Sequence, residues 1–329
     1  MPNTRRTFLQ SAALAAGMSQ APAQTPPQGR GGRGGGPPSG QGPGRGGRGG
    51  AAEVMTPPTP ASEVQVPKIK FGNVEISRMV IGYNPFHGMS HYTPTLNSLM
   101  ANYYTQERVV EVLHRCTRFG INTCSMTPSG RAAYDHEAFQ LEGGQMHIIF
   151  QGPGDPSHPS YKSLKPMAIY HHGENTDRLF QTGEMDQARE WCKKMRDTGV
   201  MVGVGSHKPE AIAMVQEQNW DVDFFVCCVY NRTRTEGERR ELLGGENPIG
   251  ELYLTDDPPR MYKVIRQTKK PCFAFKILAA GRVTNVEAAF KQAFDSIKPN
   301  DGVIVGVYSQ LKDQVRENAT IVHHLLTKS

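Results

Sequence analysis

Residues 199–218 read GVMVGVGSHKPEAIAMVQEQ, and this stretch contains one complete strand-then-helix unit. Its apolar run, Met201–Val204, has the length and composition of a buried strand. Gly199 in front of the run is the residue type that ends a preceding helix, and residues 209–218 then show helical periodicity. A buried strand followed by a crossover helix is the building unit of α/β folds. The stretch therefore predicts a chain built from repeats of this unit.

The same unit recurs along the chain. The predicted strands are Met79–Gly82, Ile121–Cys124, His147–Phe150, Met167–Tyr170, Met201–Val204, Phe224–Val229, Cys272–Phe275 and Gly302–Val307. The predicted helices cover residues 106–119, 183–198, 209–218, 258–268, 285–297 and 311–326. Eight strands predict a closed (β/α)8 (TIM) barrel over residues 65–329, because an open sheet would leave two edges unpaired. Residues 152–165 lack a helical pattern, so the third crossover is expected to be a loop.

Two insertions follow predicted strands. Residues 84–105 come after the first strand and residues 231–257 after the sixth. Such barrels build their sites from the loops at the carboxyl ends of the strands, so both insertions are expected to lie over that mouth as lids. The alternative is surface decoration without function.

The charge of the chain is concentrated at its N-terminus. Residues 1–64 account for +4 of the formal net charge of +6, and they hold 14 of the 35 glycines and 10 of the 24 prolines. A segment so poor in large apolar side chains cannot offset its ordering entropy by burial, so we expect it to be disordered. The remaining +2 argues against a specific nucleic-acid partner. No run of about 18 apolar residues is present, which argues against a transmembrane helix.

The first residues resemble a twin-arginine (Tat) export signal. Arg5 and Arg6 precede Phe8-Leu9, a weakly apolar stretch follows, and Ala21-Pro22-Ala23 has the pattern of a cleavage site. We therefore expect a signal peptide over residues 1–23, the Tat translocon as a partner, and a periplasmic or extracellular protein. Residues 24–64 are expected to be a Gly/Arg/Pro-rich linker; its two GRGGRGG repeats leave a polyanion-binding arm as the alternative.

Histidines gather at the expected mouth. His171 and His172 end the fourth strand, with Glu174 just beyond, and His207 ends the fifth. Neighbouring side chains on a strand face opposite sides, so only one of His171 and His172 can point inward. Together with Cys227 on the sixth strand, the set His172, Glu174, His207 and Cys227 is a candidate site for Zn²⁺ or Mn²⁺. Acid–base or substrate-binding histidines without a metal, and purely structural histidines, are the alternatives.

Lys276 is the other candidate catalytic residue. It follows the apolar run Cys272–Phe275 and precedes Ile277-Leu278, so an uncompensated burial of its charge would be costly. Desolvation lowers the pKa of a lysine and can make it a base or a Schiff-base nucleophile; a substrate-binding cation or a lysine that reaches solvent are the alternatives. The substrate is expected to contact residues from several mouth loops: Tyr83, Asn84, His87, Tyr230, Asn231 and Arg282. The six cysteines show no compact disulfide spacing, and none is expected to need a disulfide.

Several segments along 68–326 resemble the aldo/keto reductases, in the same order. Lys68–Gly82 resembles their opening hairpin and first barrel strand, and Phe119–Thr123 the entry to the second. Val204–Glu210 and Val229–Asn231 resemble strands five and six, and Val307–Ser309 with Arg316–Asn318 resembles the last strand and helix. The resemblance implies a barrel with an N-terminal β-hairpin and an NADP-dependent oxidoreductase ancestry.

The resemblance does not extend to the family's catalytic residues. Its Asp position falls on Cys124 or Ser125, its Tyr position near Ser129-Gly130 and its Lys position near Gln151; only the His position is matched, by His171 or His172. On the cofactor side, the resemblance implies roles for Phe275, Ser309 and Asn318, whereas Gln314 stands where a phosphate-binding Arg is common and Cys227 where a Gln is common.

The sequence thus predicts an exported aldo/keto-reductase-like barrel enzyme for a small polar carbonyl- or sugar-type substrate. Acid–base or metal-assisted chemistry by His171, His172, His207 and Lys276 is the main hypothesis. An NADP(H)-dependent carbonyl oxidoreductase with rearranged catalytic residues, and a non-catalytic periplasmic binding barrel, are the alternatives.

Overall fold

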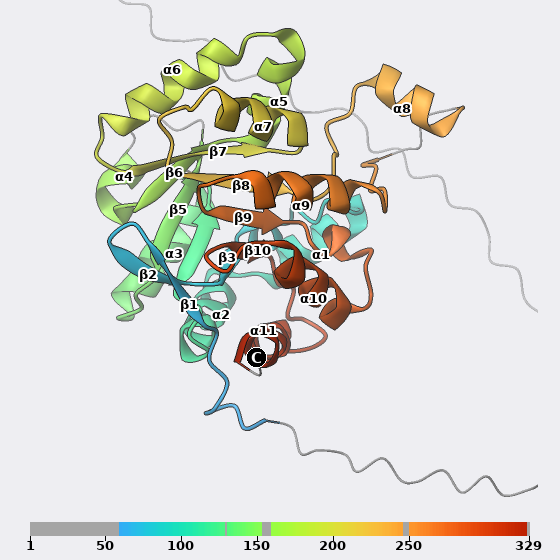
Figure 1. Ribbon diagram of the computed structural model, residues 1–329. Coiled ribbons are helices and arrows are strands. Elements are labelled where there is room, and N and C mark those ends of the chain that lie inside the picture. Colours follow the sequence, from blue (N-terminus) through green and yellow to red (C-terminus); the bar gives the residue numbers. More distant parts are fainter. Residues whose placement is uncertain (1–58, 129, 153–158, 246–249, 328–329) are drawn as a thin grey trace, which may run out of the picture. The chain divides into compact units, whose positions relative to one another are not determined.

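Eight parallel strands form a closed barrel in the computed structural model, which describes residues 59–128, 130–152, 159–245 and 250–327. Each strand pairs with the next along the chain, and the last pairs with the first (Figure 1). The barrel strands are β3 (Met79–Gly82), β4 (Thr123–Met126), β5 (His147–Gln151), β6 (Ala168–His171), β7 (Met201–Ser206), β8 (Phe224–Cys228), β9 (Cys272–Phe275) and β10 (Gly302–Val305). The predicted (β/α)8 barrel is confirmed.

Helices surround the barrel and connect its strands (Figure 1). They are η1 (Asn84–His87), α1 (Pro94–Tyr103), α2 (Gln106–Arg118), α3 (Arg131–Leu141), α4 (Pro159–Leu164), α5 (Gly173–Thr182), α6 (Met185–Arg196), α7 (Pro209–Glu217), α8 (Glu236–Leu243), α9 (Asp257–Gln267), η2 (Ala279–Gly281), α10 (Val286–Ser296) and α11 (Gln314–Thr327). The prediction that residues 152–165 form a loop was wrong at the end of that range. There the short helix α4 forms and buries Ser160 and Leu164. A helix this short has too few positions to show a period in the sequence.

An antiparallel hairpin closes one end of the barrel. Its strands β1 (Lys68–Phe71) and β2 (Val74–Ser77) turn at Gly72, whose positive φ of 59° suits glycine. The Phe71 ring meets Phe224 and Phe273 edge to face, at 5.2 and 5.3 Å between ring centroids. Phe224 and Phe273 belong to the first half of their strands, so Phe71 plugs the amino end of the barrel and leaves the carboxyl end for the site.

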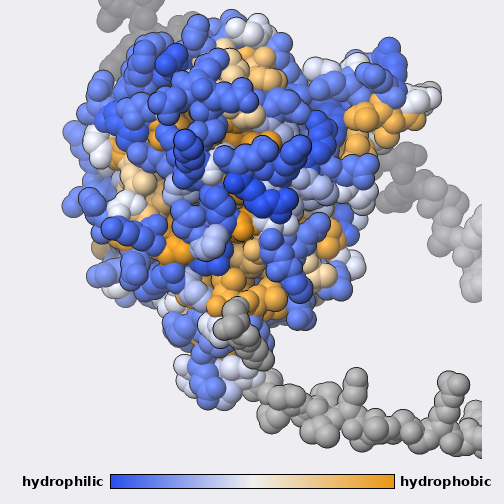
Figure 2. Space-filling model, viewed as in Figure 1, coloured by the Kyte–Doolittle hydropathy of each residue, from blue (hydrophilic) through white to orange (hydrophobic). Residues whose placement is uncertain are grey.

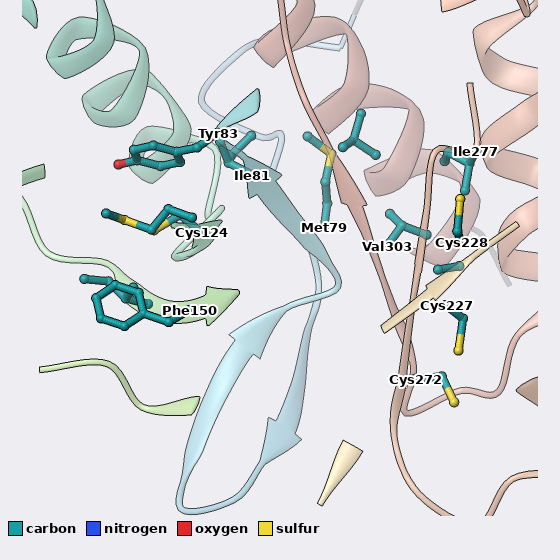
Figure 3. Packing of buried hydrophobic residues seen from close by; sticks show 14 of the residues in the cluster. Met79, Ile81, Tyr83, Cys124, Phe150, Cys227, Cys228, Cys272, Ile277 and Val303 are labelled. Atoms are coloured by element: carbon teal, nitrogen blue, oxygen red, sulfur yellow. The ribbon is translucent and has the colours of Figure 1, made fainter. Parts of the chain in front are cut away.

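Two hydrophobic layers hold the barrel together. The inner layer fills the barrel and consists of side chains such as Val80, Ile149, Phe224 and Phe273 around Phe71. The outer layer lies between the strands and the surrounding helices; Figure 3 shows part of it around Met79, Cys124, Phe150, Cys227 and Val303. All six cysteines of the chain are buried and free.

The packed chain begins close to the predicted boundary. Val64 is already fully buried. The expected signal peptide and nearly all of the expected linker lie outside the described residues. Within the described part of the chain, no helix has both the length and the apolar character needed to cross a membrane. On the face seen in Figure 2, hydrophilic residues dominate, and hydrophobic residues form several patches. One of these patches lies on α8, where Leu242 and Leu243 are exposed.

Candidate active site

The polar groups at the carboxyl end of the barrel form one connected cluster. It draws on the ends of β6, β7 and β9, the start of α5, and both predicted insertions. Its members are His91, His172, Glu174, Asp177, Ser206, His207, Arg232, Thr233, Glu251, Tyr253 and Lys276. Parallel strands bring their carboxyl ends to one rim, which is why residues so distant in sequence meet here.

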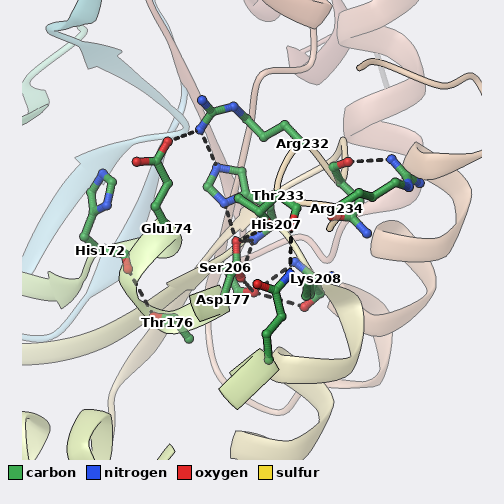
Figure 4. Close-up of polar contacts among 12 residues, drawn as sticks. His172, Glu174, Thr176, Asp177, Ser206, His207, Lys208, Arg232, Thr233 and Arg234 are labelled. Carbon is green, nitrogen blue, oxygen red and sulfur yellow. Dashed lines mark hydrogen bonds and ion pairs between the residues drawn. The ribbon is translucent and has the colours of Figure 1, made fainter. Parts of the chain in front are cut away.

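The centre of the cluster is a buried Asp177–His207 pair. His207 Nδ1 lies 2.7 Å from Asp177 Oδ2, and both side chains are almost fully buried. The same carboxylate accepts hydrogen bonds from the His207 backbone N–H at 3.1 Å and from Thr233 Oγ1 at 2.7 Å. Figure 4 shows the His207 ring between Asp177 on one side and Arg232 on the other. The carboxylate thereby fixes both the orientation of the ring and the proton on Nδ1.

Gly173 allows the helix that carries Asp177 to approach this ring. A Cβ at position 173 would lie 3.0 Å from Cε1 and 3.2 Å from Nδ1 of His207. Since real Cβ contacts at these distances are rare, a larger residue would displace the ring or the start of α5. Glycine thus lets α5 and His207 pack more closely than a larger residue would.

Arg232 links His207 to two carboxylates. Its Nη1 lies 3.4 Å from His207 Nε2 and also donates to Glu174, while its Nη2 donates to Glu251. These carboxylates keep the pKa of Arg232 above its ordinary value despite burial. The Nε–H of Arg232 is buried and has no hydrogen-bond partner among the described residues. A buried donor without a protein partner is costly, and this N–H is free to donate to a water or to a ligand.

The two insertions meet over the mouth. His91 Nδ1 from residues 84–105 lies 2.8 Å from Glu251 Oε1 from residues 231–257. Arg282 donates to the backbone carbonyl of His91 at 3.0 Å, and its guanidinium lies over the rings of Tyr92 and Tyr253 at 4.5 and 4.3 Å. The parts of the insertions around His91 and around Glu251 thus lie over the mouth, as predicted, and Arg282 serves there as a brace between them. The helix α8 within the second insertion has no buried residue.

Burial keeps the imidazoles of the mouth neutral. It lowers the pKa of His207, an effect that Asp177 opposes and that Arg232 and Lys276 reinforce. Burial also lowers the pKa of His172 and of His91. A desolvated histidine favours its uncharged form, in which one ring nitrogen can accept a proton. At neutral pH the mouth therefore offers neutral imidazole bases.

Lys276 lies at the end of β9 in an unusual backbone conformation. Its φ is 61°, and Ala279 and Ala280 in the same loop have φ values of 47° and 54°. Each such non-glycine residue costs about 1–2 kcal/mol, and strain of this kind concentrates at functional sites. Burial lowers the pKa of the Lys276 amine to about 8. Within the described residues the amine has no hydrogen bond or ion pair.

One of the predicted metal ligands, Cys227, does not face the mouth. The Cys227 side chain faces the helix layer, where it is hydrogen-bonded with Cys272, while Cys228 is the sixth-strand thiol that faces Lys276 and Arg232. No group of three or more His, Cys, Asp or Glu side chains within the described residues is arranged to hold a metal ion. The predicted set His172, Glu174, His207 and Cys227 is therefore not assembled as a metal centre.

His171 also turns away from the mouth. Its Nδ1 lies 2.7 Å from Thr176 Oγ1, and its ring contacts Trp191 of α6 at 5.1 Å between centroids. Alternation along β6 thus places His172 on the mouth side, where its neighbours are Glu174, Arg232 and His91. Of the predicted pair, only His172 is near the other mouth residues.

The predicted substrate contacts divide into two groups. Asn84 contacts His91 at 3.1 Å, and the Tyr230 ring packs against Tyr253, so both lie beside the mouth cluster. Asn231 follows Tyr230, and its backbone N–H donates to Asp257, the partner of Arg234 in a buried ion pair.

Tyr83 and His87 belong to a separate buried cluster. Tyr83 OH lies 2.8 Å from His136 Nδ1, and His87 Nε2 lies 3.8 Å from Asp135 Oδ2. His136 and Asp135 are on α3, in the helix layer. These two predicted substrate contacts are thus placed away from the His207 cluster.

Neutral side chains occupy the positions of the resembled family's catalytic Asp and Lys, which fall on Cys124 or Ser125 and near Gln151. Tyr170 OH donates to Gln151 Oε1 at 3.1 Å and lies 3.5 Å from Ser125 Oγ, inside the barrel below the mouth. Cys124 faces His136 on the outer side, at 4.0 Å. Ser129 lies outside the described residues. The described positions thus hold a hydrogen-bonded network without a charged group.

The expected cofactor residues do not form a dinucleotide cradle. The Phe275 ring is in contact with the His207 ring at 5.5 Å. Gln314 Oε1 accepts from the Tyr308 backbone N–H at 2.8 Å, and Asn318 is buried on α11. Only the Ser309 hydroxyl is buried without a hydrogen-bond partner. A dinucleotide needs several backbone or cationic donors around its phosphates, and these residues do not fit that requirement.

The sequence reasoning missed Asp177, Glu251, His91 and Thr233. Asp177 is on α5, a helix that was not predicted from the sequence. Glu251 and His91 belong to insertions whose sequences show no regular spacing of apolar residues. His91, Thr233 and Glu251 had only their membership of the two insertions as a signal, and Asp177 had none.

Comparisons with known proteins identify the fold. A scan of protein-family models and a search of curated proteins find no match for this chain. Among solved structures, the chain resembles a provisionally assigned aldo-keto reductase from Pseudomonas aeruginosa, with a TM-score of 0.50 and 16% identity over 83% of this chain and 99% of that one. It also matches Gox0644 in its apo form (TM-score 0.43, 10% identity, 79% and 93% covered) and the thermostable aldo-keto reductase Tm1743 (0.36, 13%, 78% and 93%). The first likeness shows an aldo-keto-reductase-like barrel and, at this identity, the fold alone.

Proposed function

We propose that this chain is an exported enzyme that moves a proton on a small polar carbonyl- or sugar-type substrate at the carboxyl mouth of its barrel. The observation that carries the proposal is the buried Asp177–His207 pair, with 2.7 Å between Oδ2 and Nδ1. A histidine held in one tautomer by a carboxylate is a common arrangement for general acid–base catalysis.

His207 acts as the base through Nε2. An ionised carboxylate only accepts hydrogen bonds, so Asp177 holds the proton of the neutral ring on Nδ1 and leaves the lone pair on Nε2. Burial lowers the pKa of His207, which keeps the ring neutral at physiological pH. When Nε2 takes a proton, the adjacent Asp177 carboxylate stabilises the imidazolium that forms.

Arg232 orients the substrate oxygen. Its Nε–H is buried without a partner, and its Nη1 lies beside His207 Nε2. A substrate carbonyl oxygen on this donor would lie near the base that removes the neighbouring proton. Developing negative charge on that oxygen would be stabilised by the guanidinium.

The charges of the mouth favour an uncharged polar substrate. Asp177, Glu174 and Glu251 supply three carboxylates, and Arg232, Arg282 and Lys276 supply three basic groups. A site of balanced charge offers many hydrogen-bonding groups without a net attraction for an anion. Hydroxycarbonyl compounds and small sugars fit this description.

Solvent exchange tests the proposal directly. The full chain is incubated in D2O with dihydroxyacetone, glyceraldehyde and a panel of pentoses and hexoses, and loss of the C–H signal next to the carbonyl is followed by NMR. We expect exchange on at least one compound, and a loss of about 10²–10⁴-fold in His207→Gln. His114→Gln, on the outer helix α2, is the matched control and should exchange normally. An absence of exchange across the panel would contradict the proposal.

NADP(H)-dependent carbonyl reduction is the second candidate, and the fold likeness to a provisionally assigned aldo-keto reductase favours it. A fluorescence titration with NADPH separates the two candidates. Tight NADPH binding would overturn the proton-transfer proposal, and stoichiometric Zn²⁺ or Mn²⁺ in the purified protein would favour a metal-assisted version of it. A bound sugar with neither exchange nor reduction would indicate a binding barrel.

Export is a separate part of the proposal, supported by Arg5 and Arg6 ahead of an apolar stretch. Cell fractionation of the full chain and of an Arg5→Lys, Arg6→Lys double variant tests it. The unaltered chain should be found outside the cytoplasm and the double variant inside.

A further inference from the structure

We propose that Lys276 forms a Schiff base with the carbonyl carbon of the substrate. This inference rests on the proposed function and deepens it, because it assigns a covalent intermediate to the same mouth. Four independent features of Lys276 support it: its position, its backbone conformation, its lack of partners and its neighbours.

The backbone turns the Lys276 side chain toward the mouth. Phe273 faces the barrel interior, and Phe275 packs partly against the same inner layer, so strict alternation would send residue 276 outward. The left-handed φ of 61° at Lys276 breaks this alternation. The conformation is fixed by a hydrogen bond of 2.8 Å from the Ala279 N–H to the Lys276 carbonyl oxygen. The backbone of the loop after β9 therefore determines the direction of the Lys276 side chain.

The neighbours of the amine all belong to the mouth. Arg232, Glu251 and Glu174 are the charged groups that act on Lys276, and the Cys228 thiol is a further neighbour. Lys276 in turn lowers the pKa of His207 and of His91, so the amine lies within electrostatic reach of the proposed base. Burial raises the pKa of the Cys228 thiol to about 12, so Cys228 stays neutral and does not neutralise the lysine.

The state of the amine supports nucleophilic chemistry. Only an uncharged amine attacks a carbonyl, and an ordinary lysine with a pKa of about 10.4 is uncharged in roughly one molecule in 250 at pH 8. Burial lowers the pKa of Lys276 to about 8, so about half of its amines are uncharged at that pH. Within the described residues, no hydrogen bond or ion pair occupies the nitrogen.

The covalent step conserves atoms and charge. The Nζ lone pair forms a bond to the carbonyl carbon, and the electron pair of the C=O bond moves to oxygen. One proton passes from the nitrogen to His207 Nε2 and from there to this oxygen, which gives a neutral carbinolamine and returns His207 to its neutral form. A proton from solvent then converts the hydroxyl to water, which leaves as the nitrogen lone pair forms the C=N bond of a protonated imine. The net change is amine plus carbonyl plus one proton to protonated imine plus water. The positive charge of the imine acidifies the neighbouring C–H, whose proton the neutral His207 removes.

Lys208 provides a matched control within the same rim. It follows β7, its side chain is 5% exposed, and its Nζ lies 3.1 Å from Glu238 Oε1. Lys208 is more buried than the partly exposed Lys276, and it is ion-paired. If burial alone made a lysine reactive, both Lys208 and Lys276 would be labelled. If reactivity needs an unpaired amine at the mouth, only Lys276 would be labelled.

Reductive trapping tests the inference. The full chain is incubated with dihydroxyacetone and sodium cyanoborohydride, which adds hydride to the imine carbon and leaves a stable secondary amine. Peptide mass spectrometry then locates the label. We expect Lys276 to be labelled at least about tenfold faster than any other lysine, with a midpoint near pH 8. Lys276→Met and Lys276→Arg should lose the dominant label, and Lys208→Met should keep it.

The outcomes separate this inference from the proposed function. Circular dichroism first establishes that each variant is folded, and Lys276→Arg keeps the charge if Lys276→Met does not fold. Label spread over surface lysines, or solvent exchange that survives in Lys276→Arg, would overturn the Schiff base and leave the proton-transfer function in place. Selective labelling of Lys276 in a chain that shows no exchange would support the nucleophile and contradict the proton-transfer function.

Discussion

Asp177 Oδ2 and His207 Nδ1 are 2.7 Å apart although they come from different layers of the protein, the helix α5 and the end of the barrel strand β7. Asp177 also accepts from Ser206 and Thr233, so one carboxylate ties together β7, α5 and the loop after β8. The orientation of the proposed base thus depends on a residue that lies outside the barrel wall.

Replacement of Asp177 by Asn tests this dependence. The amide has nearly the same shape, but it does not fix the proton on Nδ1 or stabilise an imidazolium. We expect the His207-dependent exchange rate to fall by about 10²–10⁴-fold while the fold is retained. Ser206→Ala removes one neighbouring hydrogen bond and should cost far less. Equal losses in the two variants, measured by NMR exchange, would show that the carboxylate has no special role.

Arg232 sets the pH range of the base. Its positive charge lowers the pKa of His207, so Arg232→Gln should raise that pKa. Since only neutral His207 accepts a proton, the acid limb of the pH–rate profile should move to higher pH. Arg260→Gln removes an exposed ion pair with Glu210 on the outer helices and should leave the profile unchanged. An acid limb that stays in place in Arg232→Gln would contradict this assignment.

Two buried histidines predict acid sensitivity of the fold. Burial lowers the pKa of both His136 and His171 to about 4. The unfolded chain binds protons on these rings below about pH 6.5, whereas the folded chain does not until about pH 4, so the free energy of unfolding should fall as the pH drops through this window. Each ring contributes on the order of 3 kcal/mol at the acid end.

Urea denaturation at several pH values between 4 and 7.5 measures this effect. His136→Gln and His171→Gln should flatten the pH dependence, and His114→Gln on the surface should not. A stability that does not change with pH would mean that the two rings are accessible to protons in the folded chain.

Phe71 should matter for stability and not for chemistry. Its ring is buried between Phe224 and Phe273 at the closed end of the barrel, so Phe71→Ala should lower the free energy of unfolding by about 3–5 kcal/mol. Ile69→Ala, on the same hairpin but only partly buried, should cost less. Exchange activity per folded molecule should remain unchanged. A large loss of activity in folded Phe71→Ala would show that the plug is coupled to the mouth.

The strands were predictable because a short apolar run between two helix ends is too short for a buried helix and fits a buried strand. Met79–Gly82 and Cys272–Phe275 have the predicted bounds, whereas β4 begins at Thr123, two residues later than predicted, because Ile121 and Asn122 precede the paired part of the strand. α5 was missed because it follows β6 directly and carries mostly polar residues. The local spacing of apolar residues thus predicts the barrel strands more reliably than it predicts the helices near the mouth.

The candidate site was predictable only in part. His207 and Lys276 were identified because polar residues at the carboxyl ends of barrel strands gather at one rim. The choice between Cys227 and Cys228, or between His171 and His172, depends on which side of a strand each residue faces. A shift of one residue reverses this orientation, and the sequence does not determine it. Asp177 and Glu251 reach the rim through tertiary structure alone.

The hairpin plug gives the chain two functionally separate ends. Phe71 and the rings around it secure the barrel where no proposed catalytic group lies, while the strained loop after β9 and both insertions surround the open end. Substitutions at the open end can therefore accumulate without weakening the aromatic cluster at the other. The residues around Arg282, rather than the barrel core, are therefore the starting library for a redesign of the mouth.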